Sequence, residues 1–181
     1  MDSVEAELAA WLAQMPAGVD ADVEAARQRI GRISRQFERV LAHAAAEHGM
    51  TVGDWEALSV LRRSGPVCTP KAIADTLGLT SGTVSVRIDR LLRAGLVEQV
   101  PATDGRSRPV RLTRTGHARW RAATAARTAY ERKLFGPLDV AALNPLLAVL
   151  LRRFEDEFGP SARHDRVPRP DHRGRVDTVS P

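Results

Sequence analysis

Hydroxyl, arginine and small side chains share one face of a helix that the sequence predicts after residue 80. Apolar residues repeat at helical spacing on the core face of this helix: Val84, Ile88, Leu91 and Leu92. At about 100° per residue, the opposite face and its margins hold Thr80, Ser81, Gly82, Thr83, Ser85, Val86, Arg87, Arg90 and Arg93. Hydroxyls can bond phosphates or base edges, a valine can meet a thymine methyl, and an arginine can fork onto guanine. This face therefore has the chemistry of a helix that reads the major groove, and Gly82 allows a close approach.

A shorter helix is predicted just upstream of this reading helix. Thr69 and Pro70 suit an N-cap followed by the first helical position. Gly78 ends the helix, and Thr80 or Ser81 can cap the next one after a short turn. Two helices joined in this way form a helix-turn-helix.

A basic hairpin is predicted after the reading helix. Two β-leaning runs at residues 96–100 and 109–112 enclose a polar tip. Arg106 and Arg108 in this tip could enter a narrow minor groove, where the negative potential is deepest. An acid beside DNA is unfavourable unless it is paired, so we expect Asp104 to orient Arg106 or an arginine of the reading helix.

The run from Trp55 to Gly116, about a third of the chain, resembles the DNA-binding domain of the MarR family of bacterial transcriptional regulators. The matching marks stand in the family's order: Leu77-Gly78-Leu79-Thr80, Arg87-Ile88-Asp89-Arg90-Leu91, Gly95-Leu96-Val97, the Asp-x-Arg tip at 104–106, and Leu112-Thr113-x-x-Gly116. The resemblance implies a mainly α fold with a small β wing, a winged helix-turn-helix joined to a helical dimerisation lobe. It also implies a ligand-responsive repressor that a small anionic or aromatic inducer releases from DNA.

Two apolar helical segments outside this region are expected to form a homodimer. Residues 21–48 carry a heptad seam: Val23, Ala26, Ile30, Ile33, Phe37, Val40 and Ala44. The last helix, capped by Asp139, holds more apolar groups than one exposed helix should: Leu143, Leu146, Leu147, Leu150, Leu151 and Phe154. The alternative is that the seam closes a monomeric core. A two-fold dimer would set its reading helices roughly 34 Å apart, so we expect a palindromic operator.

The expected organisation has five parts: an extension helix at 1–18, a dimerisation helix at 19–50, the winged helix-turn-helix at 51–115, dimerisation helices at 116–158, and a disordered basic tail at 159–181. The extension carries Trp11, which within the family resembles the urate-responsive branch. There an Asp at the second helix and an Arg near the reading helix complete a ligand pocket. Asp54 and Arg87 are the matching candidates, and Trp55 offers a second aromatic face. Asp54 is equally an N-cap, Arg87 a phosphate contact, and both tryptophans core residues.

Composition agrees with a nucleic-acid partner. The 181 residues carry a formal net charge of +5. Residues 1–26 hold six acids and no base, whereas the reading helix and hairpin gather six arginines. One cysteine, Cys68, excludes an internal disulfide, and no signal peptide or long apolar segment is present, so we expect a soluble cytoplasmic, nucleoid-associated protein.

Catalysis is not expected, and neither is a cofactor or a metal. The chain lacks a phosphate-cradling glycine loop, a spaced nucleophile with its base, and zinc-ligand spacing among its histidines. A third class is a winged helix used only to dock proteins. The arginines on the reading face and hairpin argue against it, because such a face would show exposed apolar anchors.

Overall fold

The computed structural model describes residues 1–101 and 108–160. Within these ranges the chain order is α1 (Ser3–Leu12), α2 (Ala21–Ala46), α3 (Val52–Arg63), α4 (Pro70–Leu77), α5 (Ser81–Arg93), β1 (Val97–Gln99), β2 (Val110–Leu112), α6 (Arg114–Phe135) and α7 (Val140–Phe158). The expected mainly α fold with a small β wing is confirmed. Asp104 and Arg106 of the expected wing tip, and the tail from residue 161, lie outside the described residues.

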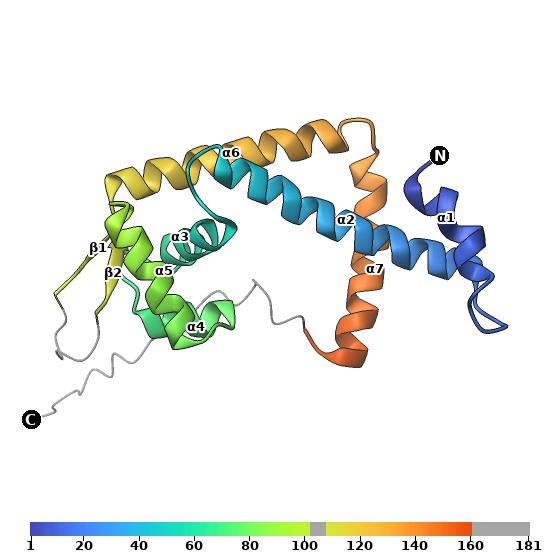
Figure 1. Cartoon of the computed structure of the whole chain (residues 1–181), viewed down its shortest axis with the longest axis horizontal. Coiled ribbons are helices and arrows are strands. Elements are labelled where there is room, and N and C mark those ends of the chain that lie inside the picture. Colours follow the sequence, from blue (N-terminus) through green and yellow to red (C-terminus); the bar gives the residue numbers. More distant parts are fainter. Residues whose placement is uncertain (102–107, 161–181) are drawn as a thin grey trace, which may run out of the picture.

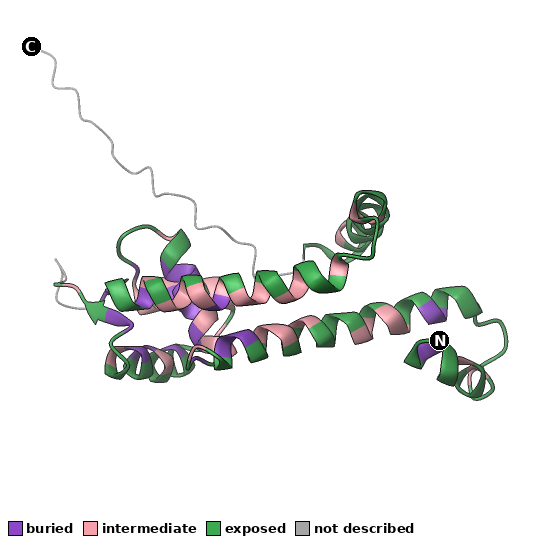
Figure 2. Ribbon diagram, turned by 90° about the horizontal axis from the view of Figure 1, so that it is seen from above, coloured by how far each residue is buried: buried purple, intermediate pink, exposed green. Residues whose placement is uncertain are grey.

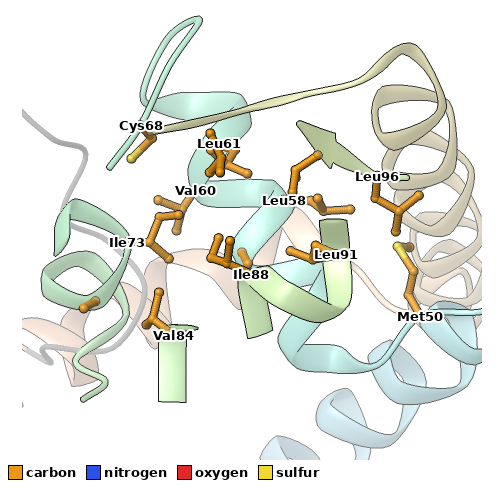
Figure 3. Packing of buried hydrophobic residues seen from close by; sticks show 14 of the residues in the cluster. Met50, Leu58, Val60, Leu61, Cys68, Ile73, Val84, Ile88, Leu91 and Leu96 are labelled. Atoms are coloured by element: carbon orange, nitrogen blue, oxygen red, sulfur yellow. The ribbon is translucent and has the colours of Figure 1, made fainter. Parts of the chain in front are cut away.

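One apolar core joins α3, α4, α5 and the two strands (Figure 3). Its largest fully buried side chains come from α3, α4, α5 and β2 and from the residue just before β1: Leu58, Val60, Ile73, Val84, Leu91, Val110 and Leu96. The core face predicted for α5 is therefore correct, since Val84, Ile88 and Leu91 are buried. This packing fixes which side of α5 faces the solvent.

Side-chain caps set where the three helices of this lobe begin. Thr69 caps α4 with Pro70 behind it, and Gly78 ends α4 in the left-handed conformation. Thr80, rather than Ser81, caps α5. The reading of Asp54 as an N-cap is wrong. Thr51 is the N-cap of α3, and Asp54 is the third helical residue, which completes a capping box.

The strands form a two-stranded antiparallel sheet with Val97 opposite Leu112 and Gln99 opposite Val110. Cys68 extends it by one bridge, because its backbone N–H and C=O both pair with Val110 at 3.0 and 2.9 Å. Behind the sheet, Gly116 lies so close to the strand that a Cβ there would overlap the carbonyl oxygen of Leu96. The glycine is what lets α6 begin against the base of the wing.

Two long helices carry this lobe (Figure 1). α2 and α6 run side by side, as both views show, and Phe37 stacks on Phe135 with ring centroids 5.8 Å apart. α1 folds back on the start of α2, at the end remote from α3 and α5 (Figure 1). α7 leaves α6 at an angle of 102°.

The end of the molecule that holds α1, α7 and the start of α2 is mostly exposed (Figure 2). Its exposed apolar side chains include Trp11, Val23, Ile30, Ile33 and Leu146. None of the residues of α7 is buried. In the described part of the chain, no single helix is long and apolar enough to cross a membrane, and only α6 and α7 taken together, across their bend, pass by length and composition.

Candidate nucleic-acid interface

The predicted reading face of α5 is turned to the solvent, with one exception. Exposed residues cover its first turns and its centre: Thr80, Ser81, Gly82, Thr83, Ser85, Val86 and Arg90. Arg87 is the exception, because its side chain keeps only 14% of its exposure. A shallow hollow of about 450 Å³ lies on this face, lined by Gly82, Thr83, Val86, Arg87 and Arg90. The face is therefore free to meet a ligand from outside the chain.

Arg90 is bound to the start of α3. Its Nε and Nη2 donate to Oδ1 of Asp54 at 2.9 and 2.6 Å, and Nη2 also donates to Oγ1 of Thr51 at 3.0 Å. Asp54 is buried to 7% side-chain exposure, whereas Arg90 keeps 46%. The second Asp54 oxygen accepts from the backbone N–H and the hydroxyl of Thr51. One carboxylate thus closes the N-terminus of α3 and holds α5.

Arg87 is also bound to α3. Its Nη1 donates to Oε2 of Glu56 at 3.2 Å, and its guanidinium lies over Gly53, where any Cβ would strike it. Arg87 and Arg90 stand one helical turn apart, so these two arginines of the face both contact the first turns of α3. α5 is therefore fixed by two ion pairs in addition to its apolar core.

The described part of the hairpin offers further positive charge. Arg108, two residues before β2 begins, is exposed. Arg111 donates to Glu98 across the sheet at 2.6 Å, which fixes its side chain along the ladder. The expected pairing of Asp104 falls outside the described residues.

The four candidate ligand residues do not meet within one chain. Trp11 donates its indole N–H to Glu24 at the start of α2 at 2.8 Å. Asp54 lies beyond the other end of α2, and at 1.5 Å per residue the helix puts roughly 30 Å between them. Trp55 donates to Thr124 of α6 at 2.9 Å and lies under Arg127, 5.2 Å from its ring centroid. Within one chain, Trp11 therefore lies far from Asp54, Trp55 and Arg87, and a ligand pocket formed by these residues stays a prediction.

Two partner residues escaped the sequence reading. Glu24 accepts from Trp11 and Arg27, and Glu56 accepts from Arg87. The capping box had a signal, because Thr51 stands three residues before Asp54. The ion pairs between α3 and α5 had no signal in the sequence, since 31 residues separate Glu56 from Arg87 and 36 residues separate Asp54 from Arg90.

The arrangement of a short capped helix, an exposed second helix and a two-stranded hairpin defines a winged helix-turn-helix protein. Residues 48–107 match the MarR family model. The HTH-type transcriptional regulator PecS of Dickeya dadantii (strain 3937) is 27% identical over 126 residues, which cover 68% of this chain and 76% of PecS. Residues 48–107 thus match a MarR-family domain, and the chain has the winged-helix fold of that family's solved structures.

Solved structures share the fold. Wild-type MarR from E. coli in its apo form superposes with a TM-score of 0.61 at 24% identity, covering 76% of this chain and 97% of MarR. A mutant MarR from E. coli complexed with operator DNA gives a TM-score of 0.57 at 23% identity, covering 72% of this chain and 96% of that one. RV1404 from Mycobacterium tuberculosis gives 0.60 at 23% identity over 80% of this chain and all of that one.

Proposed function

We propose that this chain is a transcriptional regulator that binds a palindromic operator as a homodimer and represses by occupying a promoter. The observation that carries the proposal is the solvent-facing side of α5, which has hydroxyls, a valine and a glycine outward while its core face is buried. The similar fold of a MarR solved with operator DNA supports the same use of the helix.

Positive charge lies where a duplex would meet this face. Arg108 and Arg111 lie on the hairpin, and Arg90 and Arg93 lie on α5. Arginines at these places would neutralise phosphates and release counterions, so affinity should fall steeply with salt. Base edges would be met by the side chains at the centre of α5.

The dimer is supported by the apolar surface between α2, α6 and α7. A groove of about 520 Å³ there is lined by apolar side chains with only two polar ones, and it opens beside exposed Ile30, Ile33 and Leu147. Residues along the whole of α7 remain exposed, among them Leu146, Leu150 and Phe154. A second copy of the chain that supplies its own α7 and α2 would bury these faces under two-fold symmetry. It would also set two recognition helices one DNA turn apart.

We propose that a small anionic or aromatic effector releases the protein from DNA by favouring a different spacing of the two lobes. Asp54 and Arg90 support this, because a ligand that competes for either group loosens α5 from α3. Arg87 and Trp55 lie on the same two helices, where Arg87 binds Glu56 of α3 and Trp55 binds Thr124 of α6. Trp11 would join them only from a partner chain. We also propose, from the same residues, that the chain belongs to the urate-responsive branch of the family.

Fluorescence anisotropy with DNA from the region upstream of the gene tests the regulator. Selective binding that weakens with salt and gives one dimer per site supports it. Equal affinity for that DNA and for random duplex would contradict it and would favour a protein-docking module. A thermal-shift screen of urate, salicylate and citrate then tests the effector, since a ligand bound to the folded state raises the melting temperature.

A further inference from the structure

We infer that α5 reads its half-site by apolar contact with a thymine methyl at Val86 and Gly82, and that Arg87 and Arg90 are positioning residues which leave the bases unread. The inference rests on the proposed DNA binding and adds its specificity. It departs from the expectation that one of these arginines forks onto guanine.

Arg90 has no free fork. A bidentate contact with guanine needs two N–H groups along one edge of the guanidinium. The edge formed by Nε and Nη2 donates both of its N–H groups to Asp54. The other edge, formed by Nη1 and Nη2, shares the same Nη2, which also donates to Thr51. Turning Arg90 toward a base would leave the buried carboxylate of Asp54 without its cation. Its Nη1, which makes no hydrogen bond to the described residues, can still meet a phosphate.

Arg87 is withdrawn from the surface. Its side chain is only 14% exposed and is paired with Glu56, whose own side chain is 19% exposed. A base contact would need Arg87 to leave both this carboxylate and the backbone at Gly53. The ion pairs of Arg87 and Arg90 thus fix α5 relative to α3.

Val86 is the apolar group that remains at the centre of the face. It is 66% exposed, between Thr83 one turn before and Arg90 one turn after. Most of the Val86 side chain is therefore left uncovered by the described part of the chain. In the major groove, thymine alone among the four bases carries a methyl group, which is the apolar partner such a side chain can recognise.

Gly82 supplies the space beside Val86. A Cβ built on Gly82 meets no atom of the described chain within 4 Å, so the chain's own packing does not require a glycine there. Gly82 stands in the first turn of α5, where the missing side chain leaves the helix surface open. Gly82 and Val86 stand four residues apart on the same face, and both line the hollow on α5. The gap is therefore open to an atom group from outside, of the size of a methyl.

The test replaces thymines by uracil, one position at a time, in a half-site selected from random duplexes. Uracil keeps the hydrogen-bonding edge and lacks only the methyl. One position in each half-site should lose affinity by about fourfold, and both together by about fifteenfold. Val86→Ala should remove this difference between thymine and uracil, while the matched exposed variant Ser85→Ala keeps it. Gly82→Ala should weaken thymine sites without lowering the melting temperature.

Four outcomes overturn the inference. Selective binding that is indifferent to uracil at every position contradicts it alone and leaves the proposed function standing. A Val86→Ala protein that still distinguishes thymine from uracil would also contradict the inference alone. An Arg90→Lys protein that loses its preference for one guanine only would do the same. Binding without any sequence preference overturns the proposed function as well. Circular dichroism of each variant confirms that the helices are intact.

Discussion

Asp54 of α3 and Arg90 of α5 are joined by two nitrogen contacts to one carboxylate oxygen, at 2.9 and 2.6 Å. The same carboxylate uses its other oxygen to complete the capping box with Thr51. The start of α3 and the angle of α5 therefore depend on one buried acid.

Removing Arg90 should cost stability and DNA affinity together. Arg90→Ala leaves a buried carboxylate without its cation, and because Arg90 is half exposed we expect a loss of about 1–3 kcal/mol in the free energy of unfolding. DNA binding should weaken for all sequences alike. Urea denaturation and anisotropy measure the two effects. Arg93→Ala, at an exposed arginine on the same helix, is the control for stability. Equal stability of the two variants would contradict the positioning role.

Gly116→Ala should be strongly destabilising. The added methyl would overlap the carbonyl oxygen of Leu96, a backbone atom that cannot turn aside, so the wing base and α6 must separate. We expect a cost of about 3 kcal/mol or more, at the upper end for overpacking. Gly31→Ala in α2 is the control, since its Cβ would meet only Arg35 at an ordinary 3.7 Å. Thermal unfolding of both decides the matter, and similar melting temperatures would refute the prediction.

Placing a charge in the apolar groove should separate the dimer. Ile33 is 53% exposed and lines the groove between α2, α6 and α7. Ile33→Glu would bury an unpaired carboxylate in the interface, which is costly. Sedimentation velocity should show a monomer with greatly reduced operator affinity, whereas Glu38→Ala on an exposed part of α2 should remain dimeric. A dimeric Ile33→Glu protein would place the interface elsewhere.

Docking of α1 should be lost in acid. A hydrogen bond from Glu5 N–H and the Arg29 guanidinium lower the pKa of Asp2 from 3.8 to about 2. Hydrogen bonds from Arg27, and to a smaller extent from Gln28 and Trp11, lower the pKa of Glu24 from 4.5 to about 2. Because folding lowers both pKa values, the two ionised carboxylates stabilise the folded state fully above about pH 4.5. This stabilisation, which includes the contacts of Asp2 with Arg29 and of Glu24 with Trp11, is lost as the pH falls toward 2.

The indole N–H of Trp11 reports this docking, since it donates to Glu24. Its proton resonance and the hydrogen exchange of α1 amides should change between about pH 5 and about pH 2.5. Glu24→Gln should lose docking at neutral pH and show a flatter profile. An α1 whose protection is unaltered through this range would show that apolar contacts alone hold it.

Cys68 should react slowly with thiol reagents in the folded protein. It is 5% exposed, and burial raises the pKa of its thiol, so the reactive thiolate is scarce near neutral pH. A disulfide-exchange reagent should label it only at the rate of local opening, and fully in denaturant. Rapid labelling in buffer would contradict its role as a core residue.

Local chemistry made much of this fold predictable. Thr69, Pro70 and Gly78 bound α4 because each satisfies or ends backbone groups within a few residues. The apolar repeat of Val84, Ile88 and Leu91 likewise identified the core face of α5, because periodicity alone determines which side is buried.

Pairings between distant helices could not be predicted in the same way. Arg87 and Arg90 look identical to free DNA contacts in the sequence, and only tertiary packing sets them against Glu56 and Asp54. The length of α2 likewise removed Trp11 from the other ligand candidates, a separation that residue types alone do not encode.

α6 is one unbroken helix whose first turn abuts Leu96 at the wing and whose last residue stacks on Phe37. At 1.5 Å per residue it spans about 33 Å. A rigid helix of this length would turn a small tilt near Phe37 into a larger displacement at its other end. That end is the first turn of α6, beside Leu96 and the base of the hairpin.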